Sequence, residues 1–264
     1  MLVFIVPLRS SQTSTSWEQV SKLFERCVKS LCNQTSPEFK VIVVCHERPV
    51  TKFEHPQLTY INVDFPIPVW ENNSDIYTRE TDRSRKIWTG LNNIQHQLPS
   101  HVMVVDADDL VSKHLVSFVK EHSQSNGWSI KTGYECCEGS NRAYYMSNRF
   151  YDKCGTSSII HYELLDSYKN FEFADVKGFQ FLHHQSISDL MSKNGTPLEP
   201  LPFDGIYIVG HGENLWWAST SLSKMGSKSN FKELLLFRTR RAAKTLLSKR
   251  ITEVMREEFG LFNL

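Results

Sequence analysis

Three acidic residues follow directly on an apolar run in the middle of the chain. Residues 102–105 have the composition of a buried β-strand, and Asp106, Asp108 and Asp109 come where that strand should end. A carboxylate beside a hydrophobic core needs hydrogen-bond donors or a cation. Asp109 could cap a helix, because an apolar stretch follows it. One cap does not explain three carboxylates, so Asp106 and Asp108 are candidate ligands of Mg²⁺ or Mn²⁺, which often share carboxylates with substrate phosphates.

The composition indicates a globular chain with a sizeable core. Of its 264 residues, 40% are hydrophobic, and the formal net charge of +1 gives no reason to expect nucleic acid as a partner. The sequence has no run of about 18 apolar residues, so no membrane-spanning helix is predicted. The first residues lack the basic start of a signal peptide and are interpreted as a strand. The six cysteines form no Cys-x-x-Cys pair, so we expect reduced thiols and a cytoplasmic protein.

The elements that must position the three carboxylates alternate between strands and helices. Strands are predicted at 2–7, 39–45, 58–64 and 101–105, and helices from a capping box at Thr15–Glu18 and over 82–94. This order predicts an α/β fold with a mostly parallel central sheet flanked by helices. Ligands of such sheets bind beyond the carboxyl ends of the strands. Four short segments should meet at that edge: Pro7–Arg9, His46–Arg48, Asp64 and Asp106–Asp109.

A basic segment near the end of the sequence is predicted to be helical. Residues 231–258 hold eight Lys or Arg and four Asp or Glu, and Ala243, Leu247, Ile251 and Val254 recur at helical spacing. We therefore divide the chain into a main domain, 1–228, and a C-terminal amphipathic helical extension, 229–264. Such a helix could contact an anionic membrane surface or mediate self-association. The simpler interpretation, which we favour, is a packed helix with a solvated basic face.

An Asp-x-Asp sequence at a strand end is typical of two classes of enzyme. In haloacid-dehalogenase-type phosphatases the first Asp is a nucleophile, but the motif usually follows the first strand, with Thr or Val two residues after the second Asp. Here three predicted strands come first and Leu110 occupies that position, which makes this class a poor match. The second class consists of enzymes that transfer sugars from nucleotides.

Three further segments fit the second class: "FIVPLRS" at 4–10, "VVCHE" at 43–47 and "DRSRK" at 82–86. Through these segments and their order, the chain resembles the GT-A glycosyltransferases, particularly family 2, over most of residues 1–217. The resemblance implies the GT-A fold and a nucleotide-diphosphate sugar as donor. It implies that the nucleotide is framed by Pro7, Arg9, Glu47, Arg85 or Lys86, and Asp106.

The segment "YIVGHGEN", 207–214, is similar to one that closes the site in many such enzymes, where a His completes the metal shell. The resemblance therefore implies His211 as a third ligand beside Asp106 and Asp108, and imidazole suits Mn²⁺ better than Mg²⁺. Glu213 is a rival ligand or base, and an ordinary hydrogen bond would also explain a strand-end histidine. Three aromatic residues could form a platform for a sugar or belong to the core: Tyr207, Trp216 and Trp217.

The catalytic base is where the chain departs from the family. Relatives often carry Glu-Asp about eleven residues before a glycine that ends a helix, and counting back from Gly195 reaches His184, so His183-His184 replaces the acid pair. A histidine near its normal pKa can act as a general base at neutral pH. The carboxylate alternatives are Asp175 and Asp189, of which Asp189 would share a helix with His184.

The sequence therefore predicts a metal-dependent glycosyltransferase. It would move a sugar from a nucleotide-diphosphate donor to a hydroxyl group of a glycan or another acceptor. The family implies inversion at the sugar carbon, although the histidine pair leaves that outcome open. A relative that keeps the fold but has lost turnover is the competing interpretation, because the Glu-Asp pair is missing.

Overall fold

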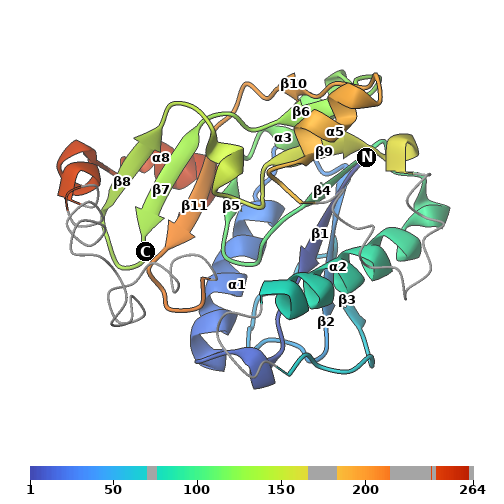
Figure 1. Cartoon of the computed structure of the whole chain (residues 1–264), viewed down its shortest axis with the longest axis horizontal. Helices are drawn as coiled ribbons and strands as arrows, with labels where there is room; N and C mark the ends of the chain where they lie inside the picture. Colours follow the sequence, from blue (N-terminus) through green and yellow to red (C-terminus); the bar gives the residue numbers. More distant parts are fainter. Residues whose placement is uncertain (70–75, 166–182, 215–238, 240–241, 262–264) are drawn as a thin grey trace.

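The computed structural model of the chain describes residues 1–69, 76–165, 183–214, 239 and 242–261. Its centre is a seven-stranded sheet in the order β10-β6-β9-β4-β1-β2-β3 (Figure 1). The strands are β1 (Leu2–Pro7), β2 (Phe39–Cys45), β3 (Leu58–Asn62), β4 (His101–Val104), β6 (Gly127–Ser129), β9 (Ser158–His161) and β10 (Glu199–Pro200). The predicted parallel arrangement is confirmed for β3, β2, β1 and β4, whereas β9 runs antiparallel to β4 and β6.

The described helices flank this sheet and a second, five-stranded sheet. They are α1 (Trp17–Cys32), α2 (Ile76–Asn93), α3 (Leu115–Glu121), α5 (Ile187–Lys193) and α8 (Glu253–Phe259). Short 3₁₀ turns occur at Ser11–Thr13, Gln95–Gln97, Phe150–Asp152 and Tyr162–Leu165. None of the helices in the described part of the chain is both long and apolar enough to cross a membrane.

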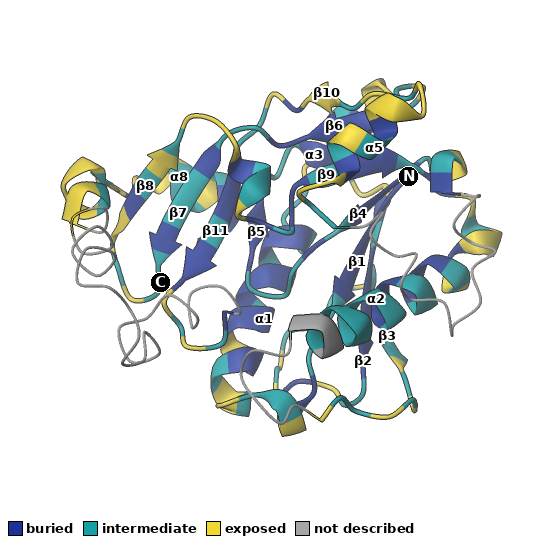
Figure 2. Cartoon of the chain, in the orientation of Figure 1, coloured by how far each residue is buried: buried dark blue, intermediate teal, exposed yellow. Residues whose placement is uncertain are grey.

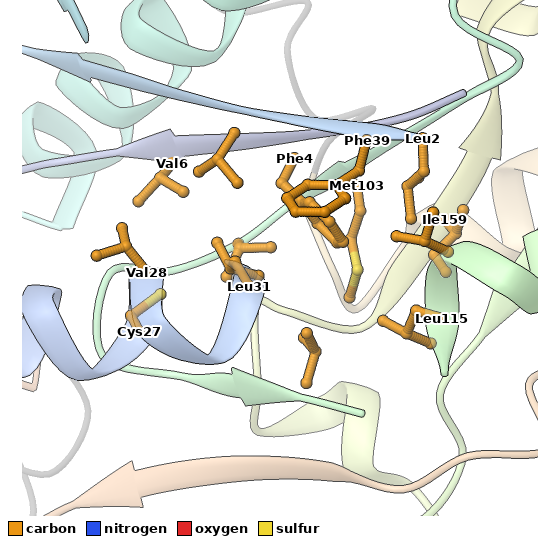
Figure 3. Close-up of a cluster of buried hydrophobic side chains, with 14 of the residues drawn as sticks. Leu2, Phe4, Val6, Cys27, Val28, Leu31, Phe39, Met103, Leu115 and Ile159 are labelled. Carbon is orange, nitrogen blue, oxygen red and sulfur yellow. The ribbon is translucent and has the colours of Figure 1, made fainter. Parts of the chain in front are cut away.

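Both faces of the central sheet are buried. Successive side chains of a strand point to opposite faces, so each strand contributes to the packing on both. From β1, Phe4 packs in a cluster that includes Leu31 of α1 (Figure 3). Ile5 points to the other face and packs in a cluster with Ile87 and Leu91 of α2. Figure 2 shows the central strands as mostly buried, as expected for parallel strands covered on both sides.

Helix α1 starts at Trp17 and lies between the two sheets (Figure 1). Its N-cap is Ser16, whose hydroxyl accepts a hydrogen bond from the backbone N–H of Gln19 at 3.2 Å. The sequence predicts the capping box one residue earlier, at Thr15–Glu18. That pair and the pair Ser16–Gln19 both have the Ser/Thr and Glu/Gln spacing of the motif. Leu23 then packs toward the second sheet.

The second half of the chain forms a five-stranded sheet in the order β12-β8-β7-β11-β5. Its strands are β5 (Leu110–Val111), β7 (Gly133–Cys137), β8 (Arg142–Met146), β11 (Gly205–Val209) and β12 (Lys249–Arg250). Strand β11 pairs parallel with β7 and antiparallel with β5. Since β5 follows the acidic residues closely, this pairing brings the end of β11 beside them.

The prediction of one continuous helix over residues 231–258 is wrong in its described part. Lys249 and Arg250 form β12, which pairs antiparallel with β8, and a separate helix, α8, follows. Ile251 and Phe259 are buried against the second sheet, whereas Leu247, predicted to share the packed helical face, is 66% exposed. Helical spacing of apolar residues could not show that strand pairing would interrupt the helix.

Candidate functional site

A cavity with a volume of about 190 Å³ opens at the carboxyl ends of β1 and β4, the edge of the sheet predicted to bind ligands. Pro7 and Arg9 line it after β1, and Asp106 and Asp108 line it after β4. Parallel pairing of β1 with β4 puts these two loops side by side. The cavity lies at the predicted edge, but of the four segments expected there His46–Arg48 and Asp64 are not among the described lining residues.

Asp108 meets residues from the loop after β11. Its Oδ2 lies 2.9 Å from Nε2 of His211 and accepts a hydrogen bond from Nδ2 of Asn214 at 3.2 Å. The Asn214 side chain is itself fixed, because Nδ2 also donates to the carbonyl of Ile208 and Oδ1 accepts from the N–H of Gly210. His211 Nε2 is buried and forms no hydrogen bond within the described residues, despite the close carboxylate. Two potential ligands thus face each other at ion-pair distance but outside hydrogen-bond geometry.

Asp106 is held differently. Its Oδ1 accepts hydrogen bonds from Nε and Nη2 of Arg83, at 2.9 and 2.8 Å. Its Oδ2 lies against Gly155, where a Cβ atom would come within 2.1 Å of that oxygen. No set of three His, Cys, Asp or Glu side chains converges as a metal site in the described ranges. The predicted triad is therefore reduced to a close pair, Asp108 and His211, with Asp106 tied to Arg83.

Asp109 is not a helix cap, as one interpretation of the sequence proposed. The chain continues as β5, and α3 begins only at Leu115, after His114. The Asp109 carboxylate is buried and accepts hydrogen bonds from Thr156 Oγ1, at 2.7 Å, and Cys154 Sγ, at 3.1 Å. Burial, reinforced by the negative charges of Asp108 and Asp106, raises the pKa of Asp109 well above its usual range.

Helix α2 supplies cations to the cavity. Lys86 lines it with a side chain that is only 1% exposed and donates a hydrogen bond to Asp82 Oδ2 at 2.7 Å. Burial lowers the pKa of Lys86, and Asp82 partly opposes that shift. The guanidinium of Arg85 instead lies over the Phe65 ring, 5.9 Å from its centroid, and Arg85 is not among the described residues that line the cavity. Of the two predicted alternatives, Lys86 is the one that faces the site.

Arg83 was missed in the sequence although it stands in the quoted "DRSRK". A helix places residues three apart on the same face, so Arg83 and Lys86 point the same way and Arg85 does not. That spacing could have identified Arg83 once Lys86 was chosen.

Glu213 and Glu47 both hold loops. Glu213 pairs with Arg9 and accepts a hydrogen bond from the N–H of Ser16 at 2.7 Å, and its side chain is 6% exposed. Glu47 accepts from Ser10 Oγ at 2.9 Å and from the N–H of Ser11. Burial alone would raise the pKa of Glu47, but these hydrogen bonds outweigh it and lower the pKa overall. Glu213 lines the cavity together with Asp108 and His211, whereas Glu47 is not among the described lining residues.

The histidine pair precedes helix α5 instead of lying on it. The backbone turns at His183, whose carbonyl accepts from the N–H groups of Ser186 and Ile187, and the helix begins at Ile187. The prediction that Asp189 shares a helix with His184 is therefore wrong. Gly195 does follow the end of α5, with φ of +77°.

His184 lines the cavity, whereas His183 and Asp189 are not among the described residues that do. The two imidazole rings stack with centroids 4.8 Å apart. Burial lowers the pKa of His184 to about 4, although the charge of Asp106 partly opposes the shift. Tyr207 also lines the cavity. Three predicted residues lie outside the described ranges: Asp175, Trp216 and Trp217.

Comparisons with known proteins match solved structures at low sequence identity. No family model matches the chain, and no curated protein matches it. Among solved structures, residues 1–349 of S. aureus TarS are 16% identical over 79% of this chain and 58% of that one, with a TM-score of 0.43. Francisella tularensis 2-C-methyl-D-erythritol 4-phosphate cytidylyltransferase (IspD) is 12% identical over 91% and 99%, with a TM-score of 0.42.

The bifunctional IspDF of Campylobacter jejuni is 16% identical over 85% of this chain and 54% of that one, with a TM-score of 0.42. The chain thus spans little more than half of the TarS and IspDF structures. Similarity at this level assigns no activity, so a functional argument has to start from the side chains in the cavity.

Proposed function

We propose that this chain is a metal-dependent glycosyltransferase that moves a sugar from a nucleotide-diphosphate donor to a hydroxyl group. The observation that carries the proposal is the meeting of Asp108 and His211 in one cavity. They come from loops a hundred residues apart, lie 2.9 Å from each other, and leave a buried imidazole nitrogen without a hydrogen bond. A buried imidazole nitrogen that faces a carboxylate outside hydrogen-bond geometry is poorly satisfied, and a shared cation would satisfy both groups.

The residues present fit a divalent ion. Asp108 and His211 would hold it, and the mixed carboxylate and imidazole donors favour Mn²⁺ over Mg²⁺. Such ions are commonly bound by one or two carboxylates together with substrate phosphates, so a third protein ligand is not required. A bound ion would neutralise negative charge on the departing diphosphate.

The chain's own cations would bind the diphosphate. Arg83 and Lys86 project from one face of α2 into the cavity, and each is already held in place by a carboxylate. Charge-assisted hydrogen bonds from such groups to phosphate are stronger than neutral ones. Arg9, fixed by Glu213, would border the nucleotide on the β1 side.

His184 is our candidate for the general base. Its lowered pKa keeps the imidazole neutral at physiological pH, so it can accept the proton of the acceptor hydroxyl. It lies across the same cavity as the acidic residues.

The phosphatase alternative fits the geometry less well. That chemistry needs Asp106 as a nucleophile, but its Oδ1 is bound by Arg83 and its Oδ2 lies close to the backbone of Gly155. A relative without turnover keeps the same geometry and is separated from an active enzyme by measurement.

The test is a binding screen followed by an assay of donor cleavage. UDP-, GDP- and dTDP-sugars with Mn²⁺ are compared by thermal shift, with a CMP-sugar as a monophosphate control, because a ligand selective for the native state raises the melting temperature. We expect one diphosphate class to stabilise the protein and chelation to remove the effect. Release of the nucleoside diphosphate then shows turnover.

The matched variants are Asp108→Asn and Asp189→Asn. Both replace a carboxylate by an amide, but Asp189 is exposed and outside the cavity lining. The first should lose metal-dependent binding and the second should keep it. Equal binding by wild type and Asp108→Asn would contradict the proposal, and binding without cleavage would identify a relative that has lost turnover.

A further inference from the structure

The acidic loop Asp106–Asp109 is bound by a segment from elsewhere in the chain, Cys154–Thr156. Strand β9 pairs antiparallel with β4, with Met103 opposite Ile159. Continuing that register three residues beyond the Met103–Ile159 pair brings Asp106 opposite Thr156. The contact is therefore set by the sheet, although fifty residues separate the two segments in the sequence.

All three residues of the segment contact the loop. Thr156 Oγ1 accepts a hydrogen bond from the N–H of Asp106 at 2.8 Å and donates one to Oδ2 of Asp109 at 2.7 Å. A hydroxyl can do both at once, since it carries one donor and two acceptor lone pairs. Cys154 Sγ donates to the same Asp109 oxygen at 3.1 Å.

Gly155 fits this arrangement because glycine has no side chain. A Cβ at this position would lie 2.1 Å from Asp106 Oδ2 and 3.1 Å from Nη2 of Arg83. The absence of a side chain lets the Asp106 carboxylate sit against the segment while Arg83 binds its other oxygen. Asp106 and Asp109 are also joined directly, because the N–H of Asp109 donates to the carbonyl of Asp106 at 3.1 Å.

We propose that Cys154, Gly155 and Thr156 are positioning residues that hold the acidic loop in the geometry with which it meets a divalent cation. Thr156 fixes both ends of the loop, and Asp108, which faces His211, lies between those ends. This inference rests on the proposed function for its purpose, but the contacts themselves can be tested without it. Partners of this kind around a metal ligand typically change metal affinity by about 10- to 100-fold.

The test compares Thr156→Val with Thr156→Ser. Valine keeps the β-branched shape but loses the hydroxyl, whereas serine keeps it. Amide hydrogen exchange over residues 106–109 should become about tenfold faster in Thr156→Val and stay near wild type in Thr156→Ser. Titration with Mn²⁺ alone, followed by electron paramagnetic resonance, should show at least about tenfold weaker binding in the valine variant only.

Thr132→Val is the matched control, because Thr132 Oγ1 also donates to a carboxylate, that of Asp204, outside the loop. It should change neither measurement. If Thr156→Val does not fold, Cys154→Ala against Cys154→Ser asks the same question of the second donor to Asp109.

Unchanged exchange in Thr156→Val would overturn the positioning role, as would faster exchange with unchanged Mn²⁺ affinity. A wild-type protein that binds no Mn²⁺ would refute the proposed metal-dependent function instead. In that case the exchange measurement still decides whether the segment positions the loop.

Discussion

The acidic loop and His184 line the same cavity but are held differently. Asp106 and Asp109 are tied by hydrogen bonds to Arg83, Cys154 and Thr156, all of them buried or half-buried. His183 and His184 stack on each other in a turn before α5. One side of the cavity is a network of several side chains, whereas His184 has one backbone hydrogen bond, to Asp152, and a stacking contact with His183.

This difference teaches which half of the proposed chemistry is preorganised. Electrostatic stabilisation of a diphosphate requires groups fixed before the reaction, because reorientation of polar groups during the reaction would cost free energy. A general base needs the unprotonated form, reach to the acceptor and sufficient basicity, and the lowered pKa of His184 provides the first while reducing the last. The rigid side thus suits the donor, and the looser side suits acceptors of varied shape.

The largest effect is expected from breaking the acidic side. Asp108→Ala should lower kcat/KM about 10³-fold, because a metal contributes several kcal/mol of charge stabilisation. The double variant Asp108→Ala/His211→Ala should lose no more than Asp108→Ala alone, since ligands of one ion act as a unit. Steady-state kinetics of donor cleavage measure both. Losses that multiply would show that His211 acts independently of Asp108.

A smaller effect is expected on the histidine side. His184→Ala should lower kcat about 10²-fold with little change in donor affinity, whereas His183→Ala should stay within a few-fold of wild type. Because the pKa of His184 is lowered to about 4, its neutral form persists in acid, so kcat should be level from pH 8 to about 5 and fall toward pH 4.

The pH profile of kcat in the enzyme–substrate complex checks this second prediction. A fall centred near pH 6.5, the ordinary value for a histidine, would mean that another group titrates or that His184 is more exposed to water during turnover. Equal losses in both single variants would show that the two rings act together.

The smallest effect concerns Glu213, which lines the cavity and pairs with Arg9. Glu213→Gln should reduce the free energy of unfolding by about 1–3 kcal/mol, because its buried carboxylate binds Arg9 and the N–H of Ser16. Mn²⁺ affinity should not change. Urea denaturation and Mn²⁺ titration provide the two readouts. Glu18→Gln, which removes an exposed ion pair with Lys22, should leave the free energy of unfolding near that of wild type.

A loss of Mn²⁺ affinity in Glu213→Gln would instead return Glu213 to the role of rival ligand that the sequence allowed. That outcome would also extend the rigid side of the cavity across to Arg9.

The parallel part of the fold could be predicted because its signals are local. Buried strands such as β1 are continuous apolar runs, and the loops after them hold the polar residues, so the position of Asp106 and Asp108 at a strand end followed directly. Arg83 was missed because nothing in the sequence states which face of α2 meets the sheet.

Long-range pairing could not be predicted from local patterns. The approach of Thr156 to Asp106 depends on the register of β9 against β4, and the break in the C-terminal helix depends on β12 pairing with β8. Asp109 was interpreted as a cap for the same reason, because its partners Cys154 and Thr156 lie far away in the sequence. These errors share one cause, which is the register of antiparallel strands.

The antiparallel pairing of β4 with β9 also has a consequence for protein engineering. The register requires a fixed number of residues between Thr156 and β9. It does not fix the length of the connection between β4 and β9. A peptide grafted at the exposed turn around Gly139, where an added side chain meets open space, should leave the acidic loop untouched. One residue inserted between Thr156 and β9 would displace the hydroxyl and turn its neighbours to the other face. Within the connection between β4 and β9, an insertion should therefore be tolerated at Gly139 and should disrupt the acidic loop next to Thr156.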